Sequence, residues 1–527
     1  AFPIFSLVNP ISENKSRSLN TYYSEIKLII KGKGLQFFLN PNFFVRPSKV
    51  FLNENVTYTG EQTSYIFKAE TNTIKLEFEG QISSCRGMFY NLENIIEIDL
   101  SDFDASKVTD MYAMFGICSN LEKVEFGNII TSSLENMFAL FEGCSKITSV
   151  NLSHFDTSKV TDMSFMFNQC SDLDNITFGN INTSSLINMA GLFQGCSEIT
   201  SIDLSNLYIS KVKDMSYMFN GCSNLEKIEF GNIDTSSLED IEATFQDCSK
   251  LMSLNLSSFE FSKVKNMFLT FGGCSKLEKI EFGNINTSSL ENMCGLFQGC
   301  SSITSIDLSK FDTSKVTIMK NMFDSCKELK YLDLSNFNTS KVNNITEMFY
   351  ECKSLTYLNL KSFELNNKVS KDYAFIRISS YVIYCIEDQE TKVYLNINSN
   401  CSHDCFKDNI KIDYENKKCK GTCTKYEYNN RCYDGCPEGS YSVFCNDNNC
   451  DNKVKECFDK TPEGYYLDEY NKIYKKCFEK CKYCYGEGNE TNNNCIECIS
   501  NFTLLIDFNN TNCYEECKYY YYFDDDN

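Results

Sequence analysis

Ten cysteines recur along this chain at intervals of 26 residues, without an insertion or a deletion. They are Cys118, Cys144, Cys170, Cys196, Cys222, Cys248, Cys274, Cys300, Cys326 and Cys352. A fixed period of this length is typical of repeat architectures. A unit of this size cannot bury its own apolar face, so neighbouring units must stack and share one core. The spacing therefore predicts a solenoid, whose function lies in a long surface or in its ends.

One unit has the sequence SKITSVNLSHFDTSKVTDMSFMFNQC, and we number its positions from the residue after the preceding cysteine. The alternate apolar residues Val150 and Leu152 predict a short strand with one side turned inward. Further on, Val160, Met163 and Phe167 fit one face of a short helix. Each unit therefore resembles one coil made of a strand, a tight turn and a short helix.

The start of the predicted helix has its own signal. Position 14 is serine in every full unit from Ser106 to Ser340, where an N-cap residue is expected. Ser132 and Glu135 also have the spacing of a capping box. We therefore expect an α/β leucine-rich-repeat solenoid of about eleven coils over residues 81–368.

The flanking regions differ from the repeats in composition. Residues 1–80 contain successive strand-like segments such as EIKLIIKG and TIKLEFEG, which predict a β-rich N-terminal capping domain. Residues 369–400 are interpreted as a connecting segment. Residues 401–527 are dense in cysteine, which predicts disulfide-stapled modules in an oxidising compartment. The chain is therefore expected to be extracellular, either secreted or on the cell surface.

The C-terminal cysteines are disulfide candidates whose pairing the spacing leaves open. They are Cys385, Cys401, Cys405, Cys419, Cys423, Cys432, Cys436, Cys445, Cys450, Cys457, Cys477, Cys481, Cys484, Cys495, Cys498, Cys513 and Cys517. For the ten repeat cysteines we favour buried thiols acting as small apolar residues. Disulfides between adjacent coils are the alternative, and a metal site is disfavoured because no histidine lies nearby. Cys85 and Cys294 lie outside the ladder and are candidates for separate bridges.

Position 7 lies on the strand between two core positions, so its side chain should point out of the sheet. The acidic residues there are contact candidates: Asp99, Glu125, Asp203, Glu229, Glu281, Asp307 and Asp333. Such a row could bind calcium or meet a basic partner. The alternative, which we favour, is an ordinary solvated face.

Thirteen N-x-S/T sequons are candidate N-glycosylation sites. They are Asn14, Asn55, Asn151, Asn175, Asn182, Asn255, Asn286, Asn338, Asn344, Asn400, Asn489, Asn501 and Asn509. Together with a first residue other than Met, they predict a glycoprotein of a secretory pathway. Asn182, Asn286 and Asn338 share position 12, and Asn151 and Asn255 share position 7. Glycans at position 7 would block the sheet as a docking surface.

The charge and the motifs disfavour several classes of function. A net charge of −21 argues against nucleic acid as a partner, and no apolar run is long enough for a transmembrane segment. The two histidines, His154 and His403, lack a nucleophile or a metal-ligand partner at a useful spacing. No phosphate loop or dinucleotide fingerprint is present. We therefore expect a protein without catalytic or metal-binding residues and without a cofactor beyond glycans.

The repeat FDTSKVTDMSFMFNQC resembles the BspA-like leucine-rich-repeat family of microbial surface proteins. The tail, including CKGTCTKYEYNNRCYDGCPEGSY, resembles the furin-like, growth-factor-receptor-type cysteine-rich modules of protist surface proteins. The resemblance implies a surface glycoprotein that acts by contact, as an adhesin, coat or matrix component, with other proteins or matrix as partners. One alternative is a subunit that polymerises into an extracellular filament through cap-to-tail contacts. A second alternative is a ligand-binding receptor ectodomain.

Overall fold

The computed structural model describes residues 23–53, 56–59, 61–179, 181–380 and 382–397. Further on it describes residues 411–413, 418–420, 426–428, 431–433, 441–443, 455–458, 460–463, 465–469, 473–489, 493–499, 503–507 and 510–514. The chain divides into two compact units. The first comprises Ala1–Leu355 with Glu364–Ser379, and the second comprises Thr356–Phe363 with Ser380–Asn527.

The N-terminal strands form one sheet with the first strands of the repeat. The strand order is β4-β3-β6-β1-β7-β8, and β1 pairs antiparallel with both β6 and β7. Alternate residues of β1, including Ile26, Leu28 and Ile30, are buried against the core. The bounds of these strands are β1 (Tyr23–Lys31), β2 (Gly34–Phe37), β3 (Lys49–Leu52), β4 (Val56–Thr59), β5 (Ser64–Phe67), β6 (Thr71–Glu79), β7 (Ile95–Asp99) and β8 (Lys123–Glu125). Strands β2 and β5 form a separate antiparallel pair.

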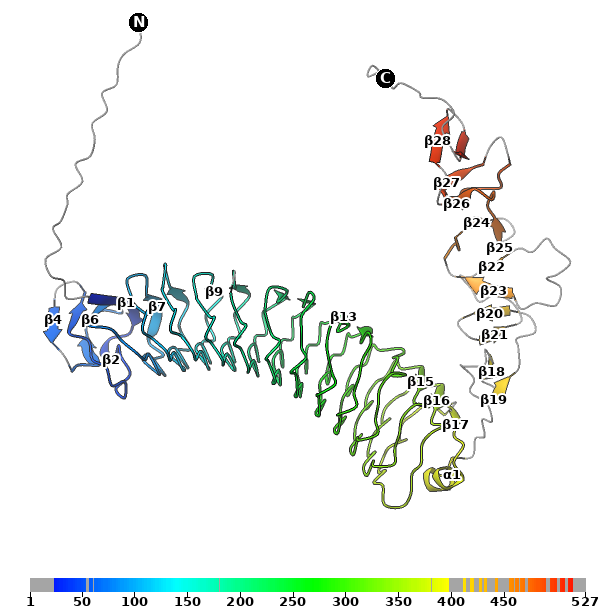
Figure 1. Ribbon diagram of the computed structural model, residues 1–527, viewed down its shortest axis with the longest axis horizontal. Helices are drawn as coiled ribbons and strands as arrows, with labels where there is room; N and C mark the ends of the chain where they lie inside the picture. Colours follow the sequence, from blue (N-terminus) through cyan, green and yellow to red (C-terminus); the bar gives the residue numbers. More distant parts are fainter. Residues whose placement is uncertain are drawn as a thin grey trace, which may run out of the picture. The chain divides into compact units, whose positions relative to one another are not determined.

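The repeats form a β-solenoid of about 11 turns, which confirms the predicted solenoid (Figure 1). Each strand occupies positions 5–7 of its coil, and equivalent residues pair in parallel, as Val150 does with Ile176. The apolar residue at position 6 lies between two outward-facing neighbours. The strands are β9 (Ser149–Asn151), β10 (Asn175–Thr177), β11 (Ser201–Asp203), β12 (Lys227–Glu229), β13 (Ser253–Asn255), β14 (Lys279–Glu281) and β15 (Tyr331–Asp333).

The prediction of a short helix in each coil is wrong. The described residues of the repeats form turns at those positions instead. Positions 18–25 form a ladder of turns in which backbone N–H groups donate to the next coil. Met137 donates to the Asp162 carbonyl at 2.9 Å, and Phe141 donates to the Met166 carbonyl at 2.8 Å. We call this element the turn ladder, and the surface it presents the turn face.

Left-handed residues explain why the turn ladder does not continue as a helix. Positions 21 and 25 have positive φ, as in Ala139 (φ 53°), Gly143 (φ 71°) and Gln169 (φ 60°). A left-handed residue every fourth position ends each turn before a helical ladder can form. Consecutive turns still return to the core every third or fourth residue. The apolar spacing therefore suits both structures.

The serine at position 14 is likewise not a helix N-cap. In the coils with Asp or Asn at position 12, its N–H donates to that side chain two residues earlier, as Ser158 does to Asp156 Oδ1 at 3.0 Å. This bond defines an Asx turn, in which a short polar side chain mimics a backbone turn. The capping-box expectation for Ser132 and Glu135 is also wrong, since the Glu135 N–H donates to the Thr109 carbonyl of the preceding coil at 2.9 Å and not to Ser132.

A column of stacked phenylalanine rings at position 23 fills the core. Neighbouring rings from Phe115 to Phe349 lie 5.0 to 5.8 Å apart, with interplanar angles of 3° to 23°. These rings are buried. Such offset contacts add to the area that aromatic residues bury, so the column stabilises each coil against the next.

The second unit begins with a parallel pair, β16 and β17, and a short helix, α1. Asp388 caps α1 by accepting the Thr391 N–H at 2.5 Å. An eight-stranded sheet of β18–β25 and two antiparallel pairs follow. The elements are β16 (Tyr357–Asn359), β17 (Ile383–Cys385), α1 (Gln389–Leu395), β18 (Lys411–Asp413), β19 (Lys418–Lys420), β20 (Tyr426–Tyr428), β21 (Arg431–Tyr433), β22 (Tyr441–Val443), β23 (Lys455–Phe458), β24 (Tyr465–Asp468), β25 (Ile473–Lys476), β26 (Cys481–Cys484), β27 (Cys495–Cys498), β28 (Thr503–Asp507) and β29 (Asn510–Tyr514).

Candidate contact surfaces

The ten ladder cysteines lie in the core as free thiols and are fully buried. Each Sγ donates to the carbonyl of the phenylalanine 29 residues earlier, as Cys222 does to Phe193 at 3.1 Å. Burial raises the pKa of the Cys222 thiol to about 12, so it stays protonated. Cys85 is also free and buried, and Cys294 is free and half-buried. The ten ladder thiols therefore bind the neighbouring coil and, being fully buried, present no reactive surface.

The acidic candidates lie at position 7 of their coils, on strands from β7 to β15 except for Asp307, and we call this surface the sheet face. The aspartates accept a hydrogen bond from the N–H two residues later, as Asp203 does from Ser205 and Asp307 does from Ser309, each at 2.9 Å. The side-chain and backbone hydrogen bonds from Ser205 hold the pKa of Asp203 below its usual value. Asp99 and Asp333 make the same bond, to Ser101 and Ser335 respectively.

The glutamates of the sheet face pair with a lysine on the same strand. Glu125 lies 2.8 Å from Lys123. The same pair recurs at Lys227–Glu229 and Lys279–Glu281, at 2.6 and 2.5 Å. Each acidic candidate thus has a local hydrogen-bond or ion-pair partner, and a lysine offsets the charge of each of the three glutamates.

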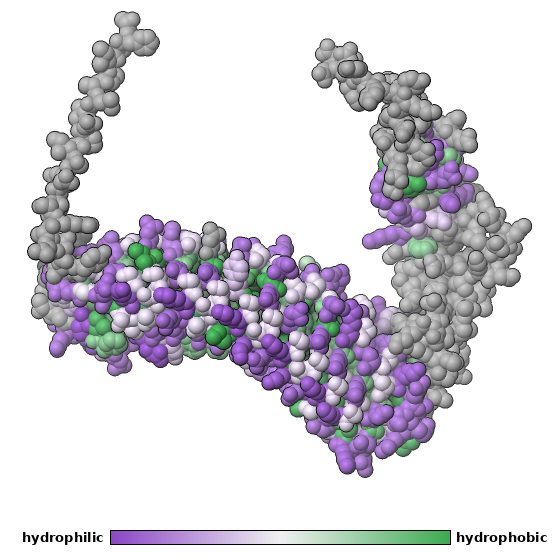
Figure 2. Space-filling view, viewed as in Figure 1, coloured by the Kyte–Doolittle hydropathy of each residue, from purple (hydrophilic) through white to green (hydrophobic). Residues whose placement is uncertain are grey.

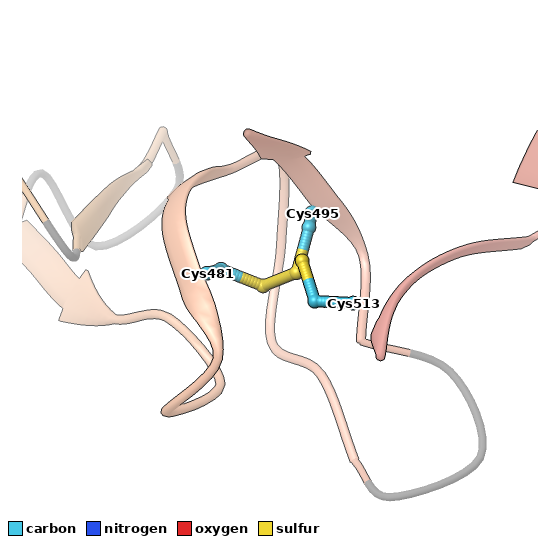
Figure 3. A group of neighbouring side chains, drawn as sticks. All are labelled: Cys481, Cys495 and Cys513. Carbon is cyan, nitrogen blue, oxygen red and sulfur yellow. A yellow bond between two sulfur atoms is a disulfide. The ribbon is translucent and has the colours of Figure 1, made fainter. Parts of the chain in front are cut away.

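Within the described residues, one group of three potential metal ligands has its donor atoms within 4.8 Å of one another, namely Cys481, Cys495 and Cys513 (Figure 3). Their sulfurs are already engaged in disulfides, because Cys481 pairs with Cys495 and Cys513 pairs with Cys498. The acidic row of the sheet face forms no such group in the described coils. The sequence analysis favoured a solvated face over a calcium site there, and that preference stays a prediction.

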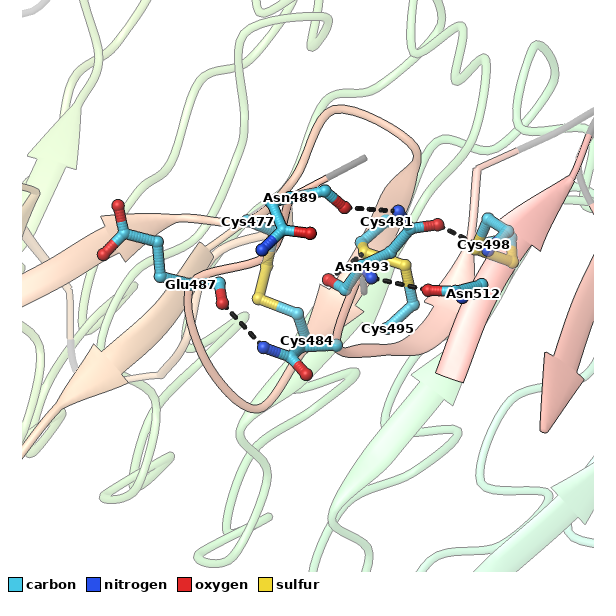
Figure 4. The surroundings of a disulfide bond; sticks show 11 residues. Cys477, Cys481, Cys484, Glu487, Asn489, Asn493, Cys495, Cys498 and Asn512 are labelled. Atoms are coloured by element: carbon cyan, nitrogen blue, oxygen red, sulfur yellow. Dashed lines mark hydrogen bonds between the residues drawn. A yellow bond between two sulfur atoms is a disulfide. The ribbon is translucent and has the colours of Figure 1, made fainter. Parts of the chain in front are cut away.

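A third disulfide, Cys477–Cys484, completes this cluster (Figure 4). Asn493 ties the cluster together, since its Nδ2 donates to the Asn489 carbonyl and its Oδ1 accepts the Cys513 N–H at 2.7 Å. Cys385 is also disulfide-bonded. The remaining candidates fall outside the residues whose side chains are described: Cys401, Cys405, Cys419, Cys423, Cys432, Cys436, Cys445, Cys450, Cys457 and Cys517. Irregular cysteine spacing could not have predicted these pairings.

The sequons gather on particular parts of the coil. Asn151, Asn175 and Asn255 are exposed on the sheet face, at positions 5 and 7. Those at position 12, on the edge that follows the strand, are also exposed: Asn182, Asn286 and Asn338. Asn489 is exposed and Asn344, at position 18, is half-buried, whereas Asn14, Asn55, Asn400, Asn501 and Asn509 lie outside the described residues. In the described coils, no sequon falls on positions 19–26.

The turn face of the first coils has a feature that the sequence analysis missed. The Arg86 guanidinium lies 3.7 Å from the Tyr112 ring centroid, Tyr112 stacks on Phe138 at 4.8 Å, and Phe165 follows at 5.8 Å. We call these four residues the aromatic row. Its three rings are half-buried and Arg86 is exposed.

The sequence did contain a signal for the aromatic row. Tyr112 and Phe138 occupy position 20, where the following coils have Ser164 and Ala190. A departure from the repeat toward large aromatic residues on a face that need not bury them is informative. On the face of the repeats that Figure 2 shows, the surface is largely hydrophilic with scattered apolar residues.

Stacked coils, with short parallel strands at the same position of successive coils, define a leucine-rich-repeat solenoid protein. A family model described as "Mycoplasma protein of unknown function, DUF285" matches residues 83–206, 187–280 and 269–382, which together exceed half of the chain. The chain belongs to this family. No curated protein matches the sequence.

Solved structures with a similar course of the chain include bacterial leucine-rich-repeat proteins. A leucine rich cell surface protein from Faecalibacterium prausnitzii is 20% identical over 51% of this chain and 74% of that chain, with a TM-score of 0.29. A leucine-rich repeat protein from Eubacterium ventriosum is 16% identical over 57% of this chain and 82% of that chain, with a TM-score of 0.33. At these TM-scores the matches support no argument about function. None of the described helices is long and apolar enough to cross a membrane.

Proposed function

We propose that this chain is an extracellular repeat glycoprotein that acts by surface contact rather than by catalysis. Three observations support the proposal: membership of a repeat family, disulfides in the second unit, and exposed sequons along the coils. A stacked solenoid offers an extended surface, which suits contact with another protein or a matrix component.

We place the contact surface on the turn face, at the aromatic row. Partly exposed aromatic rings beside an arginine are the residue types that dominate binding energy at interfaces. The sheet face is less suited to this role, because its exposed sequons would hold glycans over it. The aromatic row is the single observation that favours one face over the other.

Binding by the secreted full chain tests this proposal. Its affinity for immobilised matrix proteins and for intact cells is measured for the native chain and for Phe138→Ser. We expect roughly a 30-fold loss, because truncating a central aromatic residue costs about 2 kcal/mol at an interface.

Two further variants accompany Phe138→Ser, a second one in the aromatic row and a control on the sheet face. Arg86→Ala removes an exposed residue of the same row and should weaken binding without lowering the melting temperature. The sheet-face double variant Lys227→Ala/Glu229→Ala keeps the net charge and should bind as the native chain does. Loss of binding in the sheet-face variant, with Arg86→Ala unaffected, would reverse the assignment of the faces.

A second candidate function is self-assembly into an extracellular filament. Strand β4 is the outermost strand of the N-terminal sheet, and the pair β2–β5 has Leu35 and Ile66 opposite each other, 60% and 67% exposed. Open edges and exposed apolar strand residues favour pairing with another chain. Sedimentation velocity and electron microscopy would show fibres of fixed repeat if this is the function, and a monomer at high concentration if it is not.

A further inference from the structure

Two coils, with Ile130 and Tyr208, depart from the Asp, Asn or Glu found at position 12 of the others, on the edge that follows the strand. Tyr208 occupies this position and is 66% exposed, whereas the neighbouring coils have Asn182 and Asp234 there. A surface groove runs beside the ring, and its lining includes Asn182, Ser184, Asn206 and Tyr208. An exposed aromatic ring in a groove with amide and hydroxyl groups is a typical environment for a sugar.

Two hydrogen bonds fix the position of Asn182 and of its side-chain amide. Its Oδ1 accepts the Ser184 N–H at 3.1 Å, and its backbone carbonyl accepts the Thr157 hydroxyl at 2.7 Å. No hydrogen bond from Nδ2 to another described residue is present, so this nitrogen is open for substitution. Asn182, Thr183 and Ser184 form an N-x-S sequon.

The two coils that form the groove are held in register at this point. Thr183 Oγ1 donates to the Tyr208 carbonyl at 3.0 Å and accepts the Tyr208 N–H at 2.8 Å. Thr183 is buried, so these bonds lie in a poorly solvated environment and fix the backbone of Tyr208 beside Asn182. The groove is therefore formed before any ligand occupies it.

We propose that Asn182 bears an N-linked glycan whose first sugar lies in this groove, against the ring of Tyr208. The inference rests on the proposed extracellular route of the chain. In the transfer step, Asn182 Nδ2 forms a bond to C1 of the first sugar of a polyisoprenyl-diphosphate-linked oligosaccharide. The polyisoprenyl diphosphate leaves with the bonding electron pair, and the amide releases one proton.

The neighbouring sequons of the same column lack this arrangement. Asn286 is followed at position 12 of the next coil by Asp312, and Asn338 is followed by Glu364. A carboxylate offers no flat apolar face for the C–H groups of a sugar. Asn286, which also makes an Asx turn to Ser288, is therefore a matched control for Asn182.

The rate of deglycosylation tests the proposal. The full chain is secreted from eukaryotic cells and treated under native conditions with an amidase that cleaves the sugar from asparagine. Glycopeptide mass spectrometry then follows Asn182 and Asn286 separately. We expect cleavage at Asn182 to be about fivefold or more slower than at Asn286, because a sugar packed on a ring is less accessible.

Three variants assign the protection to the ring. Tyr208→Ala should raise the rate at Asn182 to that at Asn286, and Tyr208→Phe should keep the protection. The reciprocal change Asp312→Tyr should slow cleavage at Asn286. Equal rates in the native chain, or a slow rate at Asn182 that persists in Tyr208→Ala, would overturn the inference.

Occupancy separates this inference from the proposed function. Glycans at other sequons with none at Asn182 would overturn the inference and leave the extracellular proposal standing. A chain retained inside its own cells without any glycan would overturn the proposed function and this inference together.

Discussion

The thiol of Cys222 shows why a cysteine suits position 26 of the coil. The Phe193 carbonyl already accepts the Cys196 N–H at 3.1 Å, and the thiol of Cys222 approaches the same oxygen at 3.1 Å. A valine would fill the space and leave this oxygen with one partner, whereas serine would place a more polar atom in an apolar core. Cysteine is both a small apolar residue and a weak donor.

Because of the buried thiols, the free energy of unfolding should decrease at alkaline pH. Burial raises the pKa of Cys222 and Cys274 to about 12, whereas an unfolded thiol titrates near about 8.5. The unfolded state therefore releases its protons first. The contribution of these thiols to the free energy of unfolding should be constant below about pH 8 and fall as pH rises toward 12, by up to about 1.4 kcal/mol per pH unit for each thiol.

Chemical unfolding followed by circular dichroism at pH 7.5 and 9.5 measures this decline. The double variant Cys222→Ala/Cys274→Ala should be less stable than the native chain at pH 7.5 and should lose less stability on going to pH 9.5. An equal decline in the two proteins would show that these thiols do not ionise on unfolding.

At the scale of the element, the strand of each coil was predictable and the turn ladder was not. Alternation at Val150 and Leu152 fits a strand and little else, and one parallel partner per coil follows from the period. Val160, Met163 and Phe167 fit a helix and a run of turns equally well. The decisive signal was glycine at position 25, in Gly143, Gly195, Gly221, Gly273 and Gly299. Glycine so often at one place in a helix would be costly.

Some features of the contact surfaces were likewise predictable from the sequence, and others were not. That position 7 faces outward follows from the strand period, but its pairing with lysine at position 5 needs the rotamers of both side chains. The aromatic row depends on how position 20 of successive coils stacks, which the turn ladder determines. Sequence patterns that assume a helix cannot place Tyr112 above Phe138.

The sign of the change in unfolding free energy on replacing a glycine of the turn ladder distinguishes turns from a helix. Gly221 has a φ of 77°, and a Cβ there would lie 3.6 Å from its nearest atom outside the adjoining residues, so space is not limiting. Gly221→Ala should therefore cost about 1–2 kcal/mol of unfolding free energy through backbone strain alone. Gly221→Asn should cost less, because asparagine adopts this conformation more readily. Urea unfolding measures both, and stabilisation by alanine would indicate a helix.

At the scale of the whole molecule, cysteine chemistry differs between the two units. The described cysteines of the repeats are free, whereas those of the cluster around Cys481 are paired. The repeats gain their stability from stacked coils, whose energies add from neighbour to neighbour. The cysteine cluster depends on its covalent bonds, as small modules with little core do.

A reductant should therefore act on one unit and spare the other. After treatment with dithiothreitol, limited proteolysis should cleave within residues 473–514 while the repeats persist as a resistant fragment. The melting transition of the repeats, followed by circular dichroism, should stay within about 2 °C of its value without reductant. Loss of the resistant fragment would mean that disulfides also support the solenoid.

The hydrogen bonds of the turn ladder also align peptide dipoles along the stack of coils. From Gly87 to Glu351, the N–H groups at its odd-numbered positions donate toward the C-terminal coils and never back along the stack. Aligned peptide dipoles add, as they do in a helix, so one end of the ladder is relatively rich in acceptors and the other in donors. Two such stacks meeting end to end would complement each other only head to tail. A filament that grew by such stacking would therefore be polar, with different groups exposed at its two ends.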